Sequence, residues 1–536
     1  MAMGAFSMDG KASYVRLVSG AFALLLSYAA APAYAACQRA DVVVYGGTPG
    51  GIAAAIQAAR LKKSVILLEP TLHVGGMLSS GLTKTDASPR KNVYGGITTE
   101  FLNKAKAHYG TPDPIRIYFE SKWAESTFNA MLTSAKVKVE LQQRVLKATR
   151  VSKALTEITM LSGKAYCGTV FVDASYEGDL TLKSGAETIV GRESRAKYGE
   201  SAAGVQKLKR PEVEGKAILV DPYVIAGNRN SGLLPGVIDV GQKPLGSADT
   251  SMMAFNYRLC VTEEAGNRIP FTRPADYDPL RYETTARFLQ ALKAAGKGVD
   301  AAHFLGRGMT VNGKLDVNST RYFSTNVWHI GYDYTTGTEA KREEIRAKVR
   351  NHITGLMWFA QTDPRVPANV RQYMTKFGYC ADEFKDNGGI PYQMYVRQSR
   401  RLVGQFVLTQ NNLAKKTTYN DAIGLGFYPM DEHGMIRTVL SGFIADESRE
   451  SIGVGPYQIP YRAMLPKTSQ VTNLIVPVAL SASHAAFTSV RVEPTFMVLG
   501  QAAGAAAALA PGGRVSEVNV NKLRSTLSAA GQILKF

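Results

Sequence analysis

The chain has 536 residues, of which 45% are hydrophobic and 20% charged, and it shows no low-complexity segment and no fixed-period repeat. This composition is typical of a globular protein with two or more structural domains. The formal net charge is +19, but the basic residues are scattered and no nucleic-acid-binding motif accompanies them, so no nucleic-acid partner is expected. The charge fits either a basic surface suited to an acidic exterior or an anionic substrate or polymer.

The first 35 residues predict a secretory signal peptide. Lys11 and Arg16 form a positive n-region, LVSGAFALLLSYAAAP is a short apolar h-region, and APAYAACQ offers a cleavage site after Ala35. A membrane anchor is the alternative, but the apolar run is too short to span comfortably and no second run of about 20 apolar residues follows. We therefore expect an exported protein, periplasmic or secreted, with no stable membrane span.

A strand, a glycine turn, a helix and a second strand follow one another from Asp41 to Pro70. DVVVYG is a continuous apolar run typical of a buried parallel strand, IAAAIQAARLKK has helix-forming composition, and SVILLEP is the second strand. Gly46 permits the sharp turn, Gly51 lets the helix pack closely on the strand, and the helix N-terminus favours a pyrophosphate. The unit predicts a dinucleotide site; an ordinary βαβ unit without a nucleotide is the alternative.

Two residues of this unit bear on the motif and its ligand. Glu69 ends the second strand, where a carboxylate accepts hydrogen bonds from an adenosine ribose and repels a 2′-phosphate. Thr48 occupies the middle glycine position of G-x-G-x-x-G, so the motif departs from its usual pattern there.

The segments that follow favour FAD over NAD. HVGGMLSSGLTKTD, from His73 to Asp86, has a second glycine pair where NAD domains usually move into another helix. TVFVDASYEGDL contains a strand that ends in Asp173-Ala174-Ser175. Near the C-terminus, Pro494 is placed early in an alanine- and glycine-rich helix, whose N-terminus favours negative charge on a reduced isoalloxazine ring.

These segments, with others further on, resemble the bacterial FAD-dependent oxidoreductase family, which is related in its FAD domain to the glutathione-reductase and para-hydroxybenzoate-hydroxylase types. The matching stretches are VVVYGGTPGGIAAAIQAARL, HVGGMLSSGL, FVDASYEGDL, VGRES, FNYRLC, YVRQSRRLVG, GFYPMDEHG, PYQIPYRAMLPK and SASHAAFTSVRVEPTFMVLGQAAG. They span nearly all of the chain after the leader, in order. The resemblance implies a noncovalently bound FAD but fixes no substrate, because the chemistry of the family is diverse.

Carried over by position, the resemblance implies a set of cofactor contacts. The adenosine diphosphate part is expected at Gly46, Gly47, Thr48, Gly51 and Glu69, and adenine at the backbone of Val145. The ribityl chain and flavin are expected near Gly75, Gly76, Met77 and Ser80, with the strand end at Ala174 and Ser175 closing over the cofactor. Arg491, Glu493 and Pro494 are expected to border the flavin ring.

We expect an α/β fold, in which a Rossmann-like FAD-binding domain (a parallel sheet flanked by helices) is interrupted by an inserted α+β substrate domain. The expected parts are a signal peptide at 1–35, the FAD-binding domain at 36–190 and 465–536, and the substrate or cap domain at 191–464.

Two helices are expected in the inserted part. TEAKREEIRAKVRNHITGLMWFAQ predicts an amphipathic helix whose lysines and arginines form a solvated face. VRQSRRLVGQFVLTQ predicts another, in which Arg397 and Arg401 share one face, either as an anion-binding pair or as structural ion-pair partners.

The cysteines, at 37, 167, 260 and 380, permit two disulfides in three connectivities. If DVVVYG and TVFVDAS are parallel neighbours, Cys37 and Cys167 lie near the same strand ends, within bridging reach, and a Cys260–Cys380 pair would follow. The sequence has no CxxC spacing and no histidines at metal-ligand offsets, so no metal site is predicted.

The leader shapes the expected chemistry, because NADH and NADPH are cytoplasmic and are poor reductants for an exported enzyme. Electrons are expected to pass from a small-molecule substrate to FAD and then to oxygen, a quinone or a cytochrome-type acceptor. A base would remove a proton from an OH or NH group while the adjacent C–H delivers a hydride to flavin N5.

The candidate catalytic residues are His484, His433, Arg397 and Arg401. His484 ranks first as the base because its segment is expected at the flavin; His329 is a further candidate base, and each histidine is also open to a purely structural role. Tyr457 and Asn256 rank second as substrate contacts.

Three functions remain open. The first is an exported FAD dehydrogenase or oxidase for a small hydroxylated or amine compound, possibly sugar-derived. The second is an envelope flavin reductase fed by an electron-transfer partner. The third is a carbohydrate-binding or lyase-type protein in which the flavin fold is only structural.

Overall fold

The computed structural model describes Met1 and residues 37–85, 93–110, 117–306, 308–320, 323, 325–448 and 451–535. Apart from Met1, the expected signal peptide lies outside these ranges. None of the helices within them combines the length and the hydropathy needed to cross a bilayer.

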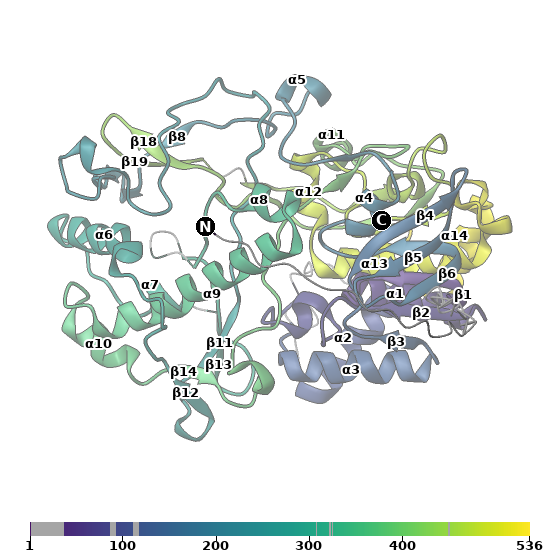
Figure 1. Cartoon of the computed structure of the whole chain (residues 1–536), viewed down its shortest axis with the longest axis horizontal. Helices are drawn as coiled ribbons and strands as arrows, with labels where there is room; N and C mark the ends of the chain where they lie inside the picture. The colour runs from purple at the N-terminus through teal and green to yellow at the C-terminus, as the bar shows by residue number, and fades with distance from the viewer. Residues whose placement is uncertain are drawn as a thin grey trace. The chain divides into compact units, whose positions relative to one another are not determined.

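A sheet of seven strands contains both the first and the last strand of the described chain, β1 and β22; the strands from β1 to β6 are labelled in Figure 1. Its order is β3-β2-β1-β6-β5-β4, with β22 also paired to β6. The strands are β1 (Gln38–Tyr45), β2 (Val65–Leu68), β3 (Lys138–Glu140), β4 (Val145–Val151), β5 (Ala154–Met160), β6 (Ala165–Asp173) and β22 (Leu474–Ile475). All pairs are parallel except those made by β4 and β5. The apolar run of β2 is buried throughout, as a parallel strand between helices requires.

Helix α1 (Pro49–Arg60) packs directly against the C-terminal helix α13 (Glu493–Leu509), although most of the chain separates them (Figure 1). Glycines make this contact possible. A Cβ atom on Gly500 would lie 1.9 Å from the carbonyl oxygen of Gly50, and one on Gly504 would lie 2.1 Å from that of Ala54. The two backbones therefore touch, and the C-terminal helix packs against the first βαβ unit.

The inserted part has its own antiparallel sheet, in the order β12-β14-β11-β13. Its strands are β11 (Leu259–Thr262), β12 (Arg268–Pro270), β13 (Lys314–Val317) and β14 (Gly378–Cys380). Helix α9 (Glu339–Thr362) is the long amphipathic helix that the sequence predicts. With the parallel sheet and its helices, this insertion gives the mixed α/β fold expected; the domain boundaries themselves stay a prediction.

Shorter elements connect these units. The remaining helices are α2 (Gly96–Tyr109), α3 (Ser121–Ser134), α4 (Asp179–Lys183), α5 (Arg195–Tyr198), α6 (Glu283–Ala294), α7 (Ala302–Leu305), α8 (Gly331–Thr336), α10 (Ala368–Met374), α11 (Gln410–Ala414), α12 (His484–Val490) and α14 (Val520–Ala529). The small sheets pair β7 (Thr188–Ile189) with β15 (Arg401–Leu402), β16 (Ala422–Gly426) with β21 (Tyr457–Pro460), β17 (Met430–Asp431) with β20 (Ser451–Ile452), β9 (Glu212–Val213) with β10 (Lys216–Ala217), and β19 (Phe443–Glu447) with both β18 (Arg437–Leu440) and β8 (Leu208–Lys209).

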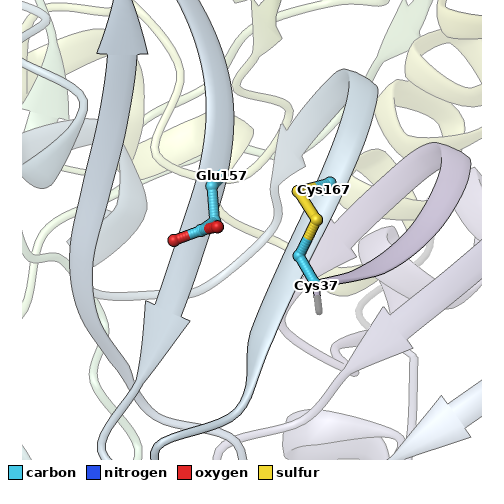
Figure 2. Close-up of side chains that lie close together, drawn as sticks. All are labelled: Cys37, Glu157 and Cys167. Atoms are coloured by element: carbon cyan, nitrogen blue, oxygen red, sulfur yellow. A yellow bond between two sulfur atoms is a disulfide. The ribbon is translucent and has the colours of Figure 1, made fainter. Parts of the chain in front are cut away.

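Both expected disulfides are present. Figure 2 shows Cys37 joined to Cys167, with Glu157 on the adjacent strand; the two Cα atoms are 5.7 Å apart. The bridge forms because β1 and β6 are parallel neighbours, with Arg39 opposite Cys167. Cys260 and Cys380 bridge the antiparallel neighbours β11 and β14, with their Cα atoms 5.6 Å apart.

Candidate functional site

The glycine turn after β1 has the tight geometry that the motif predicts. Gly46 has a φ of +101°, and a Cβ atom there would lie 2.7 Å from the carbonyl carbon of Ala174. A Cβ atom on Gly51 would lie 1.9 Å from the oxygen of Gly46, so helix α1 starts in direct contact with the turn. Only glycine fits at both positions.

Thr48, the departure from the glycine pattern, is the N-cap of α1. Its φ is −68°, so the position does not require glycine, and its hydroxyl accepts a hydrogen bond from the backbone N–H of Gly51 (3.2 Å). The same hydroxyl donates to the carbonyl of Ala174 (2.8 Å), which ties the turn to the end of β6.

Glu69 holds the turn from the other side. Its carboxylate accepts hydrogen bonds from the backbone N–H groups of Gly47 (2.7 Å) and Thr71 (2.7 Å). Burial raises the pKa of Glu69 despite these bonds. Each carboxylate oxygen has a second lone pair, so Glu69 can also accept a ribose hydroxyl.

A cavity of about 240 Å³ opens over this turn. Its lining includes Gly46, Thr48, Glu69, Arg144, Ser175, Tyr176, Arg342, Arg346, Arg350 and Met394. Val145 does not line it; the neighbouring Arg144 does. The expectation that the basic residues of α9 form only a solvated face is wrong for Arg342, which is buried and pairs with Asp179 (2.6 Å).

The second glycine segment packs on the first. Gly75 and Gly76 have φ values of +103° and +51°, and the backbone N–H of Gly75 donates to the carbonyl of Gly47 (2.7 Å). The backbone N–H of Met77 donates to the hydroxyl of Tyr176 (3.1 Å), and Ser80, three residues after Met77, is buried. The structure therefore brings the two glycine segments together at one end of the sheet.

Hydrogen bonds to Asp173 hold the strand end at Asp173-Ala174-Ser175. Asp173 accepts hydrogen bonds from the hydroxyls of Ser175 (2.7 Å) and Thr181 (2.7 Å), and burial raises its pKa to about 6. Ser175 lines the cavity, whereas Ala174 contributes its carbonyl to Thr48.

The start of α13 lies at the same place. Glu493 is in the first turn of the helix with Pro494, and its Oε1 accepts a hydrogen bond from the hydroxyl of Tyr176 (2.6 Å). Its Oε2 is buried without a hydrogen-bond partner among the described residues, and burial raises the pKa of Glu493 to about 8. The carboxyl group is therefore neutral at neutral pH and able to donate a hydrogen bond.

Arg397 and Arg401 do not share a helix face. The helix expected over VRQSRRLVGQFVLTQ is wrong: the chain from Pro391 to Arg400 is non-helical, and Arg401 belongs to the short strand β15. Arg401 is buried in an ion pair with Glu193 (2.8 Å), which is a structural role. Arg397 points elsewhere, donating from Nη1 to the carbonyl of Ala254.

A buried tyrosine, Tyr395, connects Arg397 to the segment before α13. The guanidinium of Arg397 lies 4.8 Å from the centre of the Tyr395 ring, and Nη1 of Arg491 donates to the Tyr395 hydroxyl (2.9 Å). Nη2 of Arg491 also pairs with Asp431 (3.1 Å). Burial, Glu493 and, to a lesser degree, Tyr395 raise the pKa of Tyr176, so both tyrosines belong to one buried cluster.

The candidate histidines have different surroundings. His433 places Nε2 3.2 Å from Asp431, while its Nδ1 is buried without a partner in the part of the chain that the structure describes. His484 is hydrogen-bonded on both sides, to Gln398 (2.7 Å) and Glu432 (3.1 Å). Burial lowers the pKa of both, to about 3 for His484.

The remaining candidate residues also differ in whether their side-chain atoms have hydrogen-bond partners. His329 contacts the backbone of Arg437 (3.2 Å), and burial lowers its pKa to about 4. Tyr457 is buried against Ser489 (2.8 Å). Asn256 adjoins Tyr395 through its backbone, and its side-chain oxygen is buried without a partner among the described residues.

Sequence reasoning missed Tyr176 and Tyr395, which join the separate segments of this site. Tyr176 follows directly after the Asp173-Ala174-Ser175 strand end, and Tyr395 lies within the quoted stretch YVRQSRRLVG. An aromatic residue carries no signal of its own there; only the fold shows what it contacts.

A family model described as FAD dependent oxidoreductase matches residues 41–527. The chain belongs to this family, and FAD is its cofactor. The residues present fit FAD: Gly46 of the turn lines the cavity, and the buried Glu493 at the start of α13 has an oxygen without a partner among the described residues. No curated protein matches the chain.

Several solved structures are similar over about 30% of the chain. An anhydrotetracycline hydroxylase, OxyS from Streptomyces rimosus, is 13% identical with a TM-score of 0.21. A geranylgeranyl bacteriochlorophyll reductase-like protein from Thermoplasma acidophilum is 15% identical (0.23), and L-proline dehydrogenase from P. horikoshii is 12% identical (0.24). The match spans 36%, 45% and 59% of these chains, respectively.

Proposed function

We propose that this protein is an exported FAD-dependent oxidoreductase that oxidises a small hydroxylated or amine compound. Family membership supports the redox chemistry. One observation supports the proposed oxidation of a hydroxyl or amino group. Beside the segment 491–494, Nδ1 of His433 is buried without a partner among the described residues, while Asp431 contacts the other ring nitrogen. A nitrogen in that state is suited to accept a proton from a bound substrate.

The residues of the two glycine segments and the start of α13 would hold the cofactor. Glu69 and the turn at Gly46 suit the adenosine diphosphate part, since the turn leaves backbone exposed to the cavity. Tyr176 and Glu493 suit the flavin end, because Glu493 is neutral and its unused oxygen can donate a hydrogen bond. When bound, FAD supplies a two-electron acceptor for the hydride of a substrate C–H bond.

His433 is the proposed base, in place of His484. Burial lowers the pKa of His433 well below its ordinary value, so the ring is neutral at neutral pH and ready to accept the O–H or N–H proton at Nδ1. Asp431 accepts a hydrogen bond from Nε2–H, which fixes the tautomer and stabilises the protonated ring. His484 has both nitrogens engaged and serves the surrounding packing instead.

Export and the electron acceptor are part of the proposal. The two disulfides support folding in an oxidising compartment. Oxygen, a quinone and a cytochrome-type protein are the candidate acceptors, and mixing the anaerobically reduced protein with air separates them: fast reoxidation indicates an oxidase, and slow reoxidation a dehydrogenase or reductase.

The test is a screen of small alcohols, amines, sugars and their acids for anaerobic bleaching of the bound flavin. With the compound found, His433→Gln should slow flavin reduction by about 10²–10⁴-fold at unchanged flavin content. His108→Gln, on the exposed surface of α2, is the matched control and should reduce normally. Purified protein that binds no FAD even when it is supplied would overturn the proposal.

A further inference from the structure

Arg397 is a fully buried arginine whose hydrogen-bonding capacity is mostly unused. Its side chain is 2% exposed, and Nη1 donates to the carbonyl of Ala254. Nε and Nη2 have no hydrogen-bond partner among the residues that the structure describes. Buried polar groups in folded proteins almost always have partners, so these N–H groups point to a missing acceptor.

The charges around Tyr395 lead to the same conclusion. Arg258 and Arg397 lie 5.9 and 4.8 Å from the centre of its ring, and Arg491 binds its hydroxyl. Two carboxylates serve these three guanidinium groups: Asp316 binds Arg258 (2.5 Å), and Asp431 binds Arg491 (3.1 Å). Among the described residues, Arg397 has no carboxylate in an ion pair of its own, and His433 is neutral.

The chemistry of the Arg397 side chain selects the ligand. A guanidinium is planar and offers parallel N–H donors that match the two oxygens of a carboxylate. Nε and Nη2 are the two donors that form such a fork, and both are unused. We propose that Arg397 binds a carboxylate of the substrate.

The cofactor phosphates are not the anion this site would take. The cavity over the glycine turn is lined by Gly46 and Glu69 and does not include Arg397. Arg397 instead donates a hydrogen bond to the carbonyl of Ala254. The backbone N–H of Ala254 in turn donates to the carbonyl of Gly434 (3.0 Å), the residue after His433. Two consecutive hydrogen bonds, through Ala254 and Gly434, therefore link Arg397 to the residue next to the proposed base.

This placement narrows the substrate class. Resting on the proposed function, the oxidised C–OH or C–NH group faces His433, and the carboxylate of the same molecule faces Arg397. The substrate is then a small hydroxy or amino carboxylic acid. When the substrate is an amino acid, its second N–H can donate to the side-chain oxygen of Asn256, which is also unpartnered among the described residues and linked to Tyr395 by its backbone.

The experiment titrates the purified FAD-containing protein with sodium acetate, followed by calorimetry and by the visible spectrum of the flavin. Acetamide is the neutral isostere, and sodium chloride controls for ionic strength. Arg397→Met removes the charge and the donors, and Arg397→Lys keeps only the charge. Arg371→Met, on helix α10, removes one positive charge elsewhere and is the matched control.

We expect saturable acetate binding that perturbs the flavin spectrum, at least tenfold weaker in Arg397→Met and intermediate in Arg397→Lys. Acetamide should not bind, Arg371→Met should bind like the unaltered protein, and Arg397→Met should keep its FAD and its melting temperature. Equal acetate affinity with and without Arg397, or equal binding of acetamide, overturns the carboxylate site. Loss of FAD from Arg397→Met also overturns it, because the arginine then serves the cofactor.

Failure of the substrate class and failure of the proposed function are distinguishable. If neutral alcohols or amines bleach the flavin as fast as their carboxylated analogues, the carboxylate inference fails while the oxidoreductase proposal holds. If the protein takes up no FAD, the proposed function fails, whereas calorimetry with acetate still reports on Arg397.

Discussion

The hydroxyl of Thr48 donates a hydrogen bond to the carbonyl of Ala174, 126 residues further along the chain, and caps helix α1 at the same time. The position that carries glycine in the usual motif therefore fastens two strand ends together. Compared with glycine, a threonine at position 48 restricts the backbone. Its hydroxyl forms a hydrogen bond between the two segments that are expected to contact the cofactor.

Thr48→Ala should lower the stability of the protein by about 1–2 kcal/mol, because it removes an N-cap and leaves the Ala174 carbonyl with one partner fewer. Thr48→Ser keeps the hydroxyl and should lose less than half of that. Chemical unfolding of the FAD-free proteins measures the difference. Equal stability of the alanine and serine variants would show that the hydroxyl is not used.

Glu69→Gln should weaken FAD binding about tenfold or more. The amide has one acceptor oxygen where the carboxylate has two, so either Gly47 or Thr71 loses its partner, and the charge that assists a ribose hydrogen bond disappears. Quenching of FAD fluorescence on titration gives the dissociation constant. Glu100→Gln, which breaks only the partly exposed pair with Arg60, should leave the constant unchanged.

His484→Asn should destabilise the protein by about 1–3 kcal/mol, since Gln398 and Glu432 are left with unmet hydrogen bonds in a buried place. Flavin reduction by the substrate should stay close to normal in the folded variant. Stopped-flow reduction and thermal unfolding are measured on the same sample. A large loss of rate at unchanged stability would make His484 the base and remove His433 from that role.

Glu493 makes the stability of the FAD-free protein depend on pH. Burial raises its pKa to about 8 in the folded state, above the ordinary 4.5, so folding favours the protonated form. This contribution is complete below pH 4.5 and is lost as the pH rises to about 8. Glu493→Gln should flatten that fall in a series of melting curves between pH 5 and 8. An identical slope in the variant would mean that another group is responsible.

Lys314 holds three carboxylates together between the first part of the chain and the insertion. Its Nζ contacts Glu120, Asp382 (2.8 Å) and Glu383 (2.9 Å), and the lysine is 1% exposed. Lys314→Met should cost about 3–5 kcal/mol, because the remaining acids repel one another in a buried place.

The surface pair of Lys297 with Glu214 offers the comparison for that variant: Lys297→Met should cost less than about 1 kcal/mol. Denaturant unfolding gives the free energy of unfolding of both variants. Similar decreases in the two variants would contradict the prediction that Lys314 stabilises the buried carboxylates.

Local sequence patterns were sufficient to predict the parts of the fold that are formed by residues close together in the sequence. The turn at Gly46, the strand that ends in Glu69 and the long helix α9 follow from composition and spacing, and the Cys37–Cys167 pair follows from the order of two parallel strands. The reason is physical: glycine sterics and helix periodicity act within a few residues.

Contacts across long separations could not be derived in the same way. The hydrogen bond from Tyr176 to Glu493 spans 317 residues, and no local sequence pattern near either residue predicts it. Arg397 and Arg401 have helical spacing, yet the chain between them is non-helical because it leads into β15, which pairs with the strand β7. Tertiary packing overrides local preference there.

The backbone contact between α1 and α13 sets an order of events in the life of the molecule. Helix α1 is synthesised near the beginning of the chain, but the glycines at 500 and 504 that cover it arrive near the end. Until α13 (Glu493–Leu509) has been made and has docked on α1, one of the two segments expected to hold the cofactor is missing. We therefore expect FAD to bind only after α13 has been synthesised, and a chain that ends before this helix is expected to lack bound flavin.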